Sequence, residues 1–186
     1  PMGEVAEICP LDLAPTTSAT VALVYLDALA MALMRLRNFQ ADDYAIFHPG
    51  GRLGRRLLFK VEDIMTSYEE TPRIAPEADA HTMLSAMTRG KMGAVVVESG
   101  DRHMEGLITD YDVRHQLETV GELSRMKVAG MLNANPSTCR PGDNAYEVLV
   151  TMRRRKRPIT LMPVVDEQGR LQGMLRLETL VQHGLV

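Results

Sequence analysis

The strongest constraint on this chain is an internal duplication across its last two thirds. Matching segments recur at a spacing of roughly 65 to 68 residues, which is longer than a solenoid repeat and suits a duplicated small module. Three of the matching pairs are 73–80 with 138–145, 96–98 with 164–166, and 106–108 with 173–175. Two such modules related by a pseudo-twofold axis form paired clefts where they meet. The duplication therefore favours binding of a small molecule over a repeat scaffold.

Each repeat predicts the same order of elements, β-α-β-β-α. A short extended piece ends at proline, and a helix follows with apolar residues at positions i, i+3, i+4 and i+7. Two strands come next, at 94–97 and 106–108 in the first repeat and at 161–165 and 171–175 in the second. A final helix starts near Asp110 and near Leu177. Because the valine-rich strands are apolar without alternation, we expect helices to cover both faces of each sheet.

The composition is that of an ordinary soluble globular protein. Hydrophobic residues make up 45% of the chain and charged residues 24%, which excludes a disordered chain. The net charge of −3 gives no general attraction to nucleic acid or to a membrane surface, so we expect neither partner. Cys9 and Cys139 have no disulfide or metal spacing, and the five histidines are scattered. We therefore expect a cytoplasmic location and no metal site.

A long apolar segment precedes the duplication. The run 21–36 is apolar on nearly every face, but it is shorter than the ~20 residues of a membrane span and carries Asp27. We predict a buried helix that begins near Thr17 or Ser18, either of which can cap it, and ends near Asn38. Too few residues precede this helix to cover it. It either packs against a partner chain or belongs to a domain whose remainder is absent, and we favour the second.

The stretch from 40 to 60 loses helical periodicity and connects the apolar helix to the repeats. The run 48–54 (HPGGRLG) is dense in turn-forming residues and is expected to be a loop.

The end of the second strand in the first repeat carries the most suggestive chemistry. Thr109 ends the strand and Asp112 lies in the first turn of the next helix, where free backbone N–H groups attract phosphate. A hydroxyl and a carboxylate at such a place suit the two hydroxyls of a ribose. The alternative is that both side chains only cap the helix, because Asp is favoured in a first turn.

The second repeat departs from this pattern. Arg176 replaces Thr109, and Thr179 replaces Asp112, so the carboxylate is gone and a guanidinium, a better anion clamp, has replaced the hydroxyl. We therefore expect two unequal clefts. One favours a nucleoside, and the other contributes positive charge or stays empty.

A basic run, 153–157 (RRRKR), closes the helix of the second repeat. Cations stabilise a helix C-terminus, and a solvated run is the simplest interpretation. In a second interpretation part of the run, including Arg157, lines the cleft and holds phosphate or carboxylate. Nucleic-acid binding, the third, is disfavoured by the net charge and by the lack of interleaved aromatic residues. Lys91, Met92 and Gly93 hold the comparable position in the first repeat, where Gly93 lets a ligand ring approach the backbone.

Both repeats resemble CBS motifs, which pair into a Bateman module that binds adenosyl or other nucleotide ligands. The sequence Gly106-Leu107-Ile108-Thr109, followed by Asp112, is similar to the ribose-binding signature of that family. The resemblance implies an α/β (α+β) fold, with one CBS motif at 60–125 and a second at 126–186.

The upstream part resembles a second family. Residues 9–18 (CPLDLAPTTS), the apolar helix and the run 48–55 are similar to the end of the sugar isomerase (SIS) domain of bacterial D-arabinose 5-phosphate isomerases. The resemblance implies that 1–59 are the C-terminal remnant of a truncated SIS domain. It also implies interconversion of D-ribulose 5-phosphate and D-arabinose 5-phosphate, a proton transfer that feeds synthesis of Kdo, the acidic sugar of lipopolysaccharide.

The catalytic histidine of that family corresponds to His48. We expect it to be inactive here, because the family's other active-site residues correspond to positions upstream of Pro1 and a lone imidazole cannot orient a substrate. The rival interpretation is an isomerase that acts by itself.

The resemblance implies a regulatory role with no required cofactor. Because the pathway ends in CMP-Kdo, feedback binding of that nucleotide sugar is the expected function, with Thr109 and Asp112 holding the ribose. Arg114, Arg157 and Arg176 would pair with the phosphate and the Kdo carboxylate. The alternatives are an adenine nucleotide as effector, or a dimerisation module with empty clefts. In each case we expect a homo-oligomer, formed through the CBS pairs and the N-terminal helix.

Overall fold

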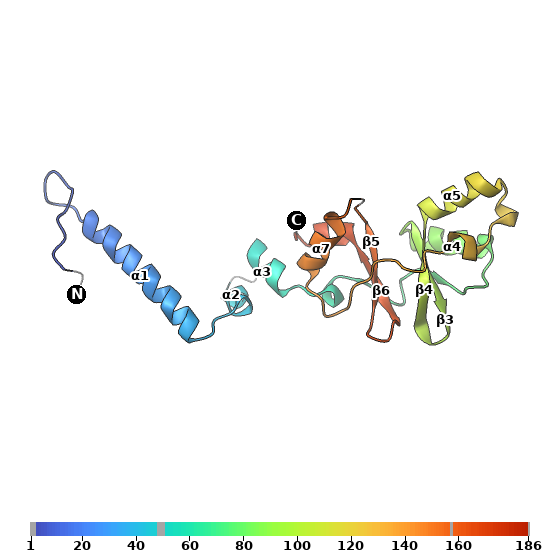
Figure 1. Cartoon of the computed structure of the whole chain (residues 1–186), viewed down its shortest axis with the longest axis horizontal. Helices are drawn as coiled ribbons and strands as arrows, with labels where there is room; N and C mark the ends of the chain where they lie inside the picture. The colour runs from blue at the N-terminus through green and yellow to red at the C-terminus, as the bar shows by residue number, and fades with distance from the viewer. Residues whose placement is uncertain (1–2, 48–50, 157, 186) are drawn as a thin grey trace. The chain divides into compact units, whose positions relative to one another are not determined.

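The computed structural model describes residues 3–47, 51–156 and 158–185. The chain divides into two compact units, Pro1–Phe47 and His48–Val186. In the described part of the first unit a non-helical segment precedes two helices, and the second unit contains both repeats and their two small sheets (Figure 1).

Helix α1 (Thr17–Leu36) dominates the first unit and is followed by α2 (Ala41–Phe47). No residue of α1 is buried, and the side chains of Leu23, Val24 and Tyr25 are each more than half exposed. The prediction of a buried helix is therefore wrong for this chain by itself, because nothing in the described part of the first unit packs over the apolar faces. By length and composition α1 is apolar enough to cross a membrane, although core helices of soluble proteins pass the same test.

Helix α1 begins where predicted, but a different side chain caps it. Thr16 is the N-cap residue and makes no side-chain cap bond, and neither predicted cap, Thr17 or Ser18, fills that role. Instead the Glu7 carboxylate accepts hydrogen bonds from the backbone N–H of Thr16 (2.6 Å) and of Ser18 (3.3 Å) and from the Thr16 hydroxyl (2.8 Å). Hydrogen bonds from Ser18 and Thr16 lower the pKa of Glu7 to about 2.

Glu7→Gln is expected to fray the first turn of α1. Because the folded pKa of Glu7 lies below its usual value of 4.5, the cap is complete above that pH and is lost as the pH falls through about 2. Amide exchange protection at Thr16 and Ser18, followed while the pH is lowered, checks this. Glu4→Gln, which removes a nearby carboxylate, should leave the protection unchanged. Full protection in Glu7→Gln would contradict the assignment of the cap.

The segment between the apolar helix and the repeats is more helical than predicted. Helix α3 (Arg52–Leu58) runs through Gly54, so the predicted loop at 48–54 is wrong over its second half. The reason is that leucine and arginine are good helix formers and offset the cost of a single glycine. The Asn144 side-chain amide donates to the backbone carbonyls of Arg56 (3.0 Å) and Leu57 (3.1 Å), which ties the end of α3 to the second repeat.

The predicted β-α-β-β-α order of the first repeat is confirmed. In its sheet β3 (Ala94–Ser99) lies between a parallel neighbour, β2 (Arg73–Ile74), and an antiparallel one, β4 (His103–Thr109). The helices are α4 (Ala80–Gly90) after β2 and α5 (Asp110–Val120) after β4. The shorter elements are η1 (Val61–Asp63), β1 (Thr66–Ser67), η2 (Gly100–Arg102) and η3 (Leu123–Arg125).

The second repeat follows the same plan, except that its predicted first strand is reduced to an isolated parallel bridge between Cys139 and Val164. Its elements are α6 (Val128–Met131), α7 (Ala145–Arg153), β5 (Leu161–Val165), β6 (Leu171–Arg176) and α8 (Leu177–Gln182). Equivalent side chains cap the equivalent helices. The Asp79 carboxylate accepts from the N–H of Thr82 (2.7 Å) at the start of α4, and the Asn144 side chain accepts from the N–H of Tyr146 (3.0 Å) at the start of α7.

In each repeat, the segment that precedes its own sheet pairs with the sheet of the other repeat. We call these two exchanged pieces, around Thr66 and Asn133, the entering segments. Strand β1 of the first repeat pairs with β6 of the second, where Thr66 faces Met174. Reciprocally, Asn133 of the second repeat bridges to Leu107 in β4 of the first. Each repeat therefore completes the sheet of the other, and a pseudo-twofold axis relates the two halves of the second unit.

The sheets are covered differently from the prediction. One face of the first sheet, with Val95, Val97 and Ile108, packs on the helical side of its repeat, and α7 and α8 contribute to the equivalent core of the second. On the other face Ala94, Val96 and Leu107 pack against Leu171 and Met174 of the second repeat. Helices cover one face only, and the second face is apolar because the sheets of the two repeats pack on each other (Figure 1).

Candidate functional site

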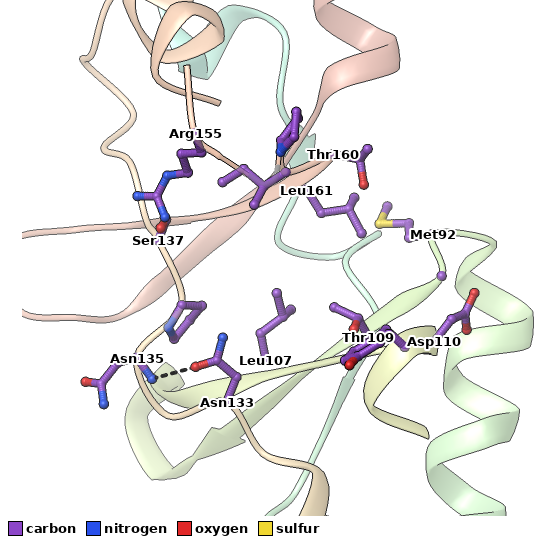
Figure 2. A pocket seen from close by; sticks show the side chains of 15 residues that line it. Met92, Leu107, Thr109, Asp110, Asn133, Asn135, Ser137, Arg155, Thr160 and Leu161 are labelled. Atoms are coloured by element: carbon purple, nitrogen blue, oxygen red, sulfur yellow. Dashed lines mark hydrogen bonds between the residues drawn. The ribbon is translucent and has the colours of Figure 1, made fainter. Parts of the chain in front are cut away.

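A cleft of about 700 Å³ lies where the two repeats meet, and we call it the first cleft. Its volume is in the range of about 300 to 1,000 Å³ that is usual for small-molecule sites. The lining residues are Met92, Gly93, Leu107, Thr109, Asp110, Tyr111, Asn133, Asn135, Pro136, Ser137, Arg155, Pro158, Ile159, Thr160 and Leu161. Figure 2 shows Leu107, Thr109 and Asp110 of the first repeat across the cleft from Arg155, Thr160 and Leu161 of the second.

The wall from the first repeat is set by the strand ends. Strand β4 ends at Thr109, and α5 begins at Asp110, whose N–H donates to the Gly93 carbonyl (2.9 Å). Gly93 has a φ of +66°, a conformation that favours glycine, and a Cβ there would lie 2.9 Å from Asp110 Oδ2. Gly93 therefore keeps the backbone open at the edge of the cleft, beside the Asp110 carboxylate.

A segment of the second repeat forms the floor. Asn133 and Leu107 exchange two backbone hydrogen bonds of 3.0 Å each, which fix the segment against β4. The Asn133 side chain then accepts from the N–H of Asn135 (3.1 Å), drawn as a dashed line in Figure 2. Both asparagine side chains are exposed and line the cleft. They offer amide donors and acceptors of the kind that read the edge of a planar base.

The cation of the cleft comes from the basic run. Helix α7 ends at Arg153, so Arg155 lies beyond the helix, where it points toward Ser137 (Figure 2). Among the described lining residues Arg155 is the one basic side chain and Asp110 the one acidic side chain. Arg153 and Arg154 are exposed and do not line the cleft. The described members of the run, 153–156, are thus exposed, and Arg155 among them is placed to hold an anion.

The side chains of Thr109 and Asp112 interact with each other at the start of α5. Asp112 Oδ2 accepts from the Thr109 N–H (2.8 Å) and from the Thr109 hydroxyl (2.5 Å). Thr109 lines the cleft, whereas Asp112 is not among the lining residues. The geometry is that of the capping alternative, in which the carboxylate serves the helix.

The other predicted site residues are dispersed. Met92 and Gly93 line the first cleft, but Lys91 and Arg114 are exposed side chains outside it. Arg176 lines a separate hollow of about 500 Å³, which we call the second hollow, and makes an ion pair with Glu178 (2.5 Å). His48 and Arg157 lie outside the described residues.

Sequence reasoning missed much of the floor and the facing wall. The missed polar residues are Asp110, Asn133, Asn135, Ser137, Arg155 and Thr160. One signal was available. Thr160 stands in the second repeat where Gly93 stands in the first, and a pseudo-twofold axis brings such equivalent positions to the same interface. The floor had no local signal, since it depends on the exchange of segments between repeats.

The arrangement suits a ligand with a flat ring, a sugar and one anionic group. Leu107, Ile159 and Leu161 offer apolar contact, while hydroxyl and amide groups and Arg155 supply the polar contacts. Among the described residues no three His, Cys, Asp or Glu side chains gather to bind a metal ion.

Comparisons with known proteins agree with this geometry. A family model described as the CBS domain matches residues 61–119 and 128–185. Arabinose 5-phosphate isomerase KdsD of Escherichia coli O6:H1 (strain CFT073) is 39% identical over 180 residues, which are 97% of this chain and 54% of that protein. The chain therefore spans about half the length of the curated relatives it matches.

Two solved structures have a similar fold. CBSX2, crystallised in complex with AMP, has a TM-score of 0.58 at 23% identity, over 68% of this chain and 96% of that one. The CBS domain of a bacterial CNNM/CorC family Mg²⁺ transporter, in complex with ATP, has a TM-score of 0.59 at 24% identity, over 71% of this chain and 91% of that one.

Proposed function

Because this chain belongs to the CBS domain family, we propose that its two repeats form a regulatory module that binds a nucleotide in the first cleft. The observation that carries the proposal is the composition of that cleft, where the Thr109 hydroxyl, two asparagine amides and the Arg155 guanidinium converge around apolar side chains. AMP in CBSX2 and ATP in the transporter support the ligand class.

The charge of the cleft narrows the ligand. One described cation, Arg155, and one acid, Asp110, fit a nucleoside that carries a single phosphoryl group better than a triphosphate. AMP has this chemistry, and so does the nucleotide part of CMP-Kdo. A nucleoside monophosphate, free or linked to a sugar, is therefore the ligand that we propose.

The biological role follows from the likeness to KdsD. We propose that the intact protein is a cytoplasmic arabinose 5-phosphate isomerase, with residues 1–59 ending its SIS domain, CBS motifs at 60–125 and 126–186, and CMP-Kdo as feedback effector. His48 belongs to the isomerase site in this proposal and is inactive in this chain by itself. Regulation then requires that the effector bind two arrangements of the protein with unequal affinity.

Titration calorimetry of the chain with AMP, ATP, CMP and CMP-Kdo tests the ligand class. Binding of CMP-Kdo and CMP without AMP would establish the feedback role, and binding of AMP without the cytidine compounds would replace it by adenine-nucleotide sensing. No binding by any of the four would remove the proposed function. In that case the exposed apolar face of α1 favours an assembly module, which sedimentation of the chain at several concentrations would test.

Arg155→Ala is expected to weaken binding of the nucleoside monophosphate by about tenfold, because a charge-assisted hydrogen bond contributes about 1.5 kcal/mol or more. Arg154→Ala is the matched control. Arg154 is the neighbouring residue and carries the same charge, but its side chain does not line the cleft. Its replacement should therefore change the affinity little. Calorimetry at two salt concentrations measures both effects. Equal losses in the two variants would show general electrostatic attraction instead of a contact.

A further inference from the structure

The pseudo-twofold axis requires a second cleft, and the second hollow occupies part of its place. Five of the eight lining residues of this hollow have equivalents that line the first cleft: Met92 corresponds to Ile159, Thr160 to Gly93, Arg176 to Thr109, Leu177 to Asp110, and Glu178 to Tyr111. The correspondence covers the wall formed by the strand ends and the first turn of the following helix. The second hollow is therefore the outer part of the equivalent cleft.

The second hollow lacks the residues that would correspond to the floor of the first cleft. In the first cleft the floor is the second crossover segment (133–138), which contributes Asn133, Asn135 and Ser137. The first crossover segment (66–73) begins at the equivalent pairing, Thr66 with Met174, but contributes no lining residue to the second hollow. Tyr68 stands where the second crossover segment has Asn135.

Tyr68 packs inward. Its side chain lies against the core between the two sheets, together with Met174, Met92 and Leu161. Leu107, the equivalent of Met174, lines the first cleft, whereas Met174 is fully buried and lines no described hollow. An aromatic side chain of the first crossover segment thus packs against the apolar cluster in which Met174 is buried.

Three charged side chains hold the Tyr68 ring. Its hydroxyl donates to Glu98 Oε1 (2.9 Å), and burial together with this carboxylate raises the pKa of Tyr68. The Arg73 and Arg102 guanidinium groups lie 4.1 Å and 4.0 Å from the ring centroid. Arg73 also donates to the Tyr68 backbone carbonyl (2.7 Å), so the ring and its backbone are both fixed.

The first crossover segment is also longer. Between equivalent pairings it has two more residues than the second crossover segment, which gives it the length to fold inward. Its Pro72 packs so closely on the end of α4 that a Cβ at Gly90 would collide with the proline ring. Arg155 stands at the position equivalent to Gly90 and lines the first cleft instead. The end of α4, which is equivalent to the end of α7, is therefore covered by the segment that carries Tyr68.

We propose that Tyr68 is an internal plug that closes the second cleft, so that the chain binds its nucleotide in the first cleft only. The statement about nucleotide number rests on the proposed function, whereas the closure of the second cleft does not. Arg73, Arg102 and Glu98 act as positioning residues for the plug.

Thiol labelling tests the closure without any nucleotide. Met174→Cys and Leu107→Cys place thiols at equivalent positions, one under the plug and one in the open cleft. We expect the thiol of Met174→Cys to react with N-ethylmaleimide at least about tenfold more slowly, as read from the modified peptide by mass spectrometry. Adding Tyr68→Asn, which copies Asn135, should bring the two rates within a few fold. Adding Tyr68→Phe, which keeps the ring, should leave the slow rate unchanged.

Calorimetry with AMP or CMP-Kdo, whichever binds, supplies the second readout. We expect one nucleotide per chain with Tyr68 in place and two in Tyr68→Asn. Equal labelling rates with Tyr68 in place, or two nucleotides bound to the unmodified chain, would overturn the plug. Absence of nucleotide binding would remove the proposed function while the labelling result still decides the plug. If Tyr68→Asn does not fold, the comparison of Met174→Cys with Leu107→Cys in the unmodified background decides it.

Discussion

Gly106→Ala and Gly173→Ala are each expected to lower the free energy of unfolding by about 1 to 3 kcal/mol, the usual cost of overpacking a core. Both glycines lie where a strand of one repeat meets the entering segment of the other. A Cβ at Gly106 would collide with the Asn133 backbone carbonyl, and a Cβ at Gly173 with that of Thr66. Because a backbone carbonyl in a sheet cannot rotate away, relief requires that the exchanged segment move.

Urea unfolding monitored by circular dichroism measures the effect, and Gly142→Ala is the control. A Cβ at Gly142 would meet no other atom within 4 Å, and the residue has no positive φ, so its replacement should be neutral or slightly stabilising. Because the exchange is reciprocal, losses of similar size are expected at Gly106 and Gly173. If only one of the two variants loses stability, the two exchanged segments do not contribute equally to the fold.

The elements of the repeats could be predicted because their signals are local. Apolar spacing in α4 and α7 and the valine-rich runs of β3 and β5 depend only on neighbours in sequence. The exchange of entering segments could not be predicted in this way, since β1 is a two-residue strand whose partner, β6, lies about a hundred residues away. The apolar runs show that both faces of a sheet are buried, but they do not show whether a helix or another sheet covers the second face.

The residues of the candidate site also divide into those with a local sequence signal and those that depend on the exchange of segments. Thr109, Met92 and Gly93 were predicted because they stand at the ends of strands and carry or permit contacts. Arg155 was not singled out within the basic run because the place where α7 ends decides which side chains lie at the cleft, and a run of like residues gives no signal for that boundary. Asn133 and Asn135 lie in a loop in sequence and become a binding surface only through the exchange.

The sequence pattern and the geometry point to different carboxylates as the group that binds the ribose. The family signature assigns Asp112, and this assignment stays a prediction. In the structure Asp112 Oδ2 serves the amide and hydroxyl of Thr109, whereas Asp110 lines the first cleft beside Gly93. Asp110 is exposed, so a ligand can reach its carboxylate without breaking a helix cap.

Asp110→Asn is therefore expected to weaken binding of the nucleoside monophosphate by tenfold or more, since a hydrogen bond to a charged group contributes about 1.5 to 3 kcal/mol. Its effect on stability should be small. Asp112→Asn is the matched comparison, and because it weakens the cap of α5 it should lower the free energy of unfolding by about 0.5 to 2 kcal/mol, with a smaller loss of affinity. Calorimetry and urea unfolding of both variants separate the two roles. The reverse result, with affinity lost in Asp112→Asn and unchanged in Asp110→Asn, would show that the ligand displaces the Thr109 contact and that the signature residue holds the ribose.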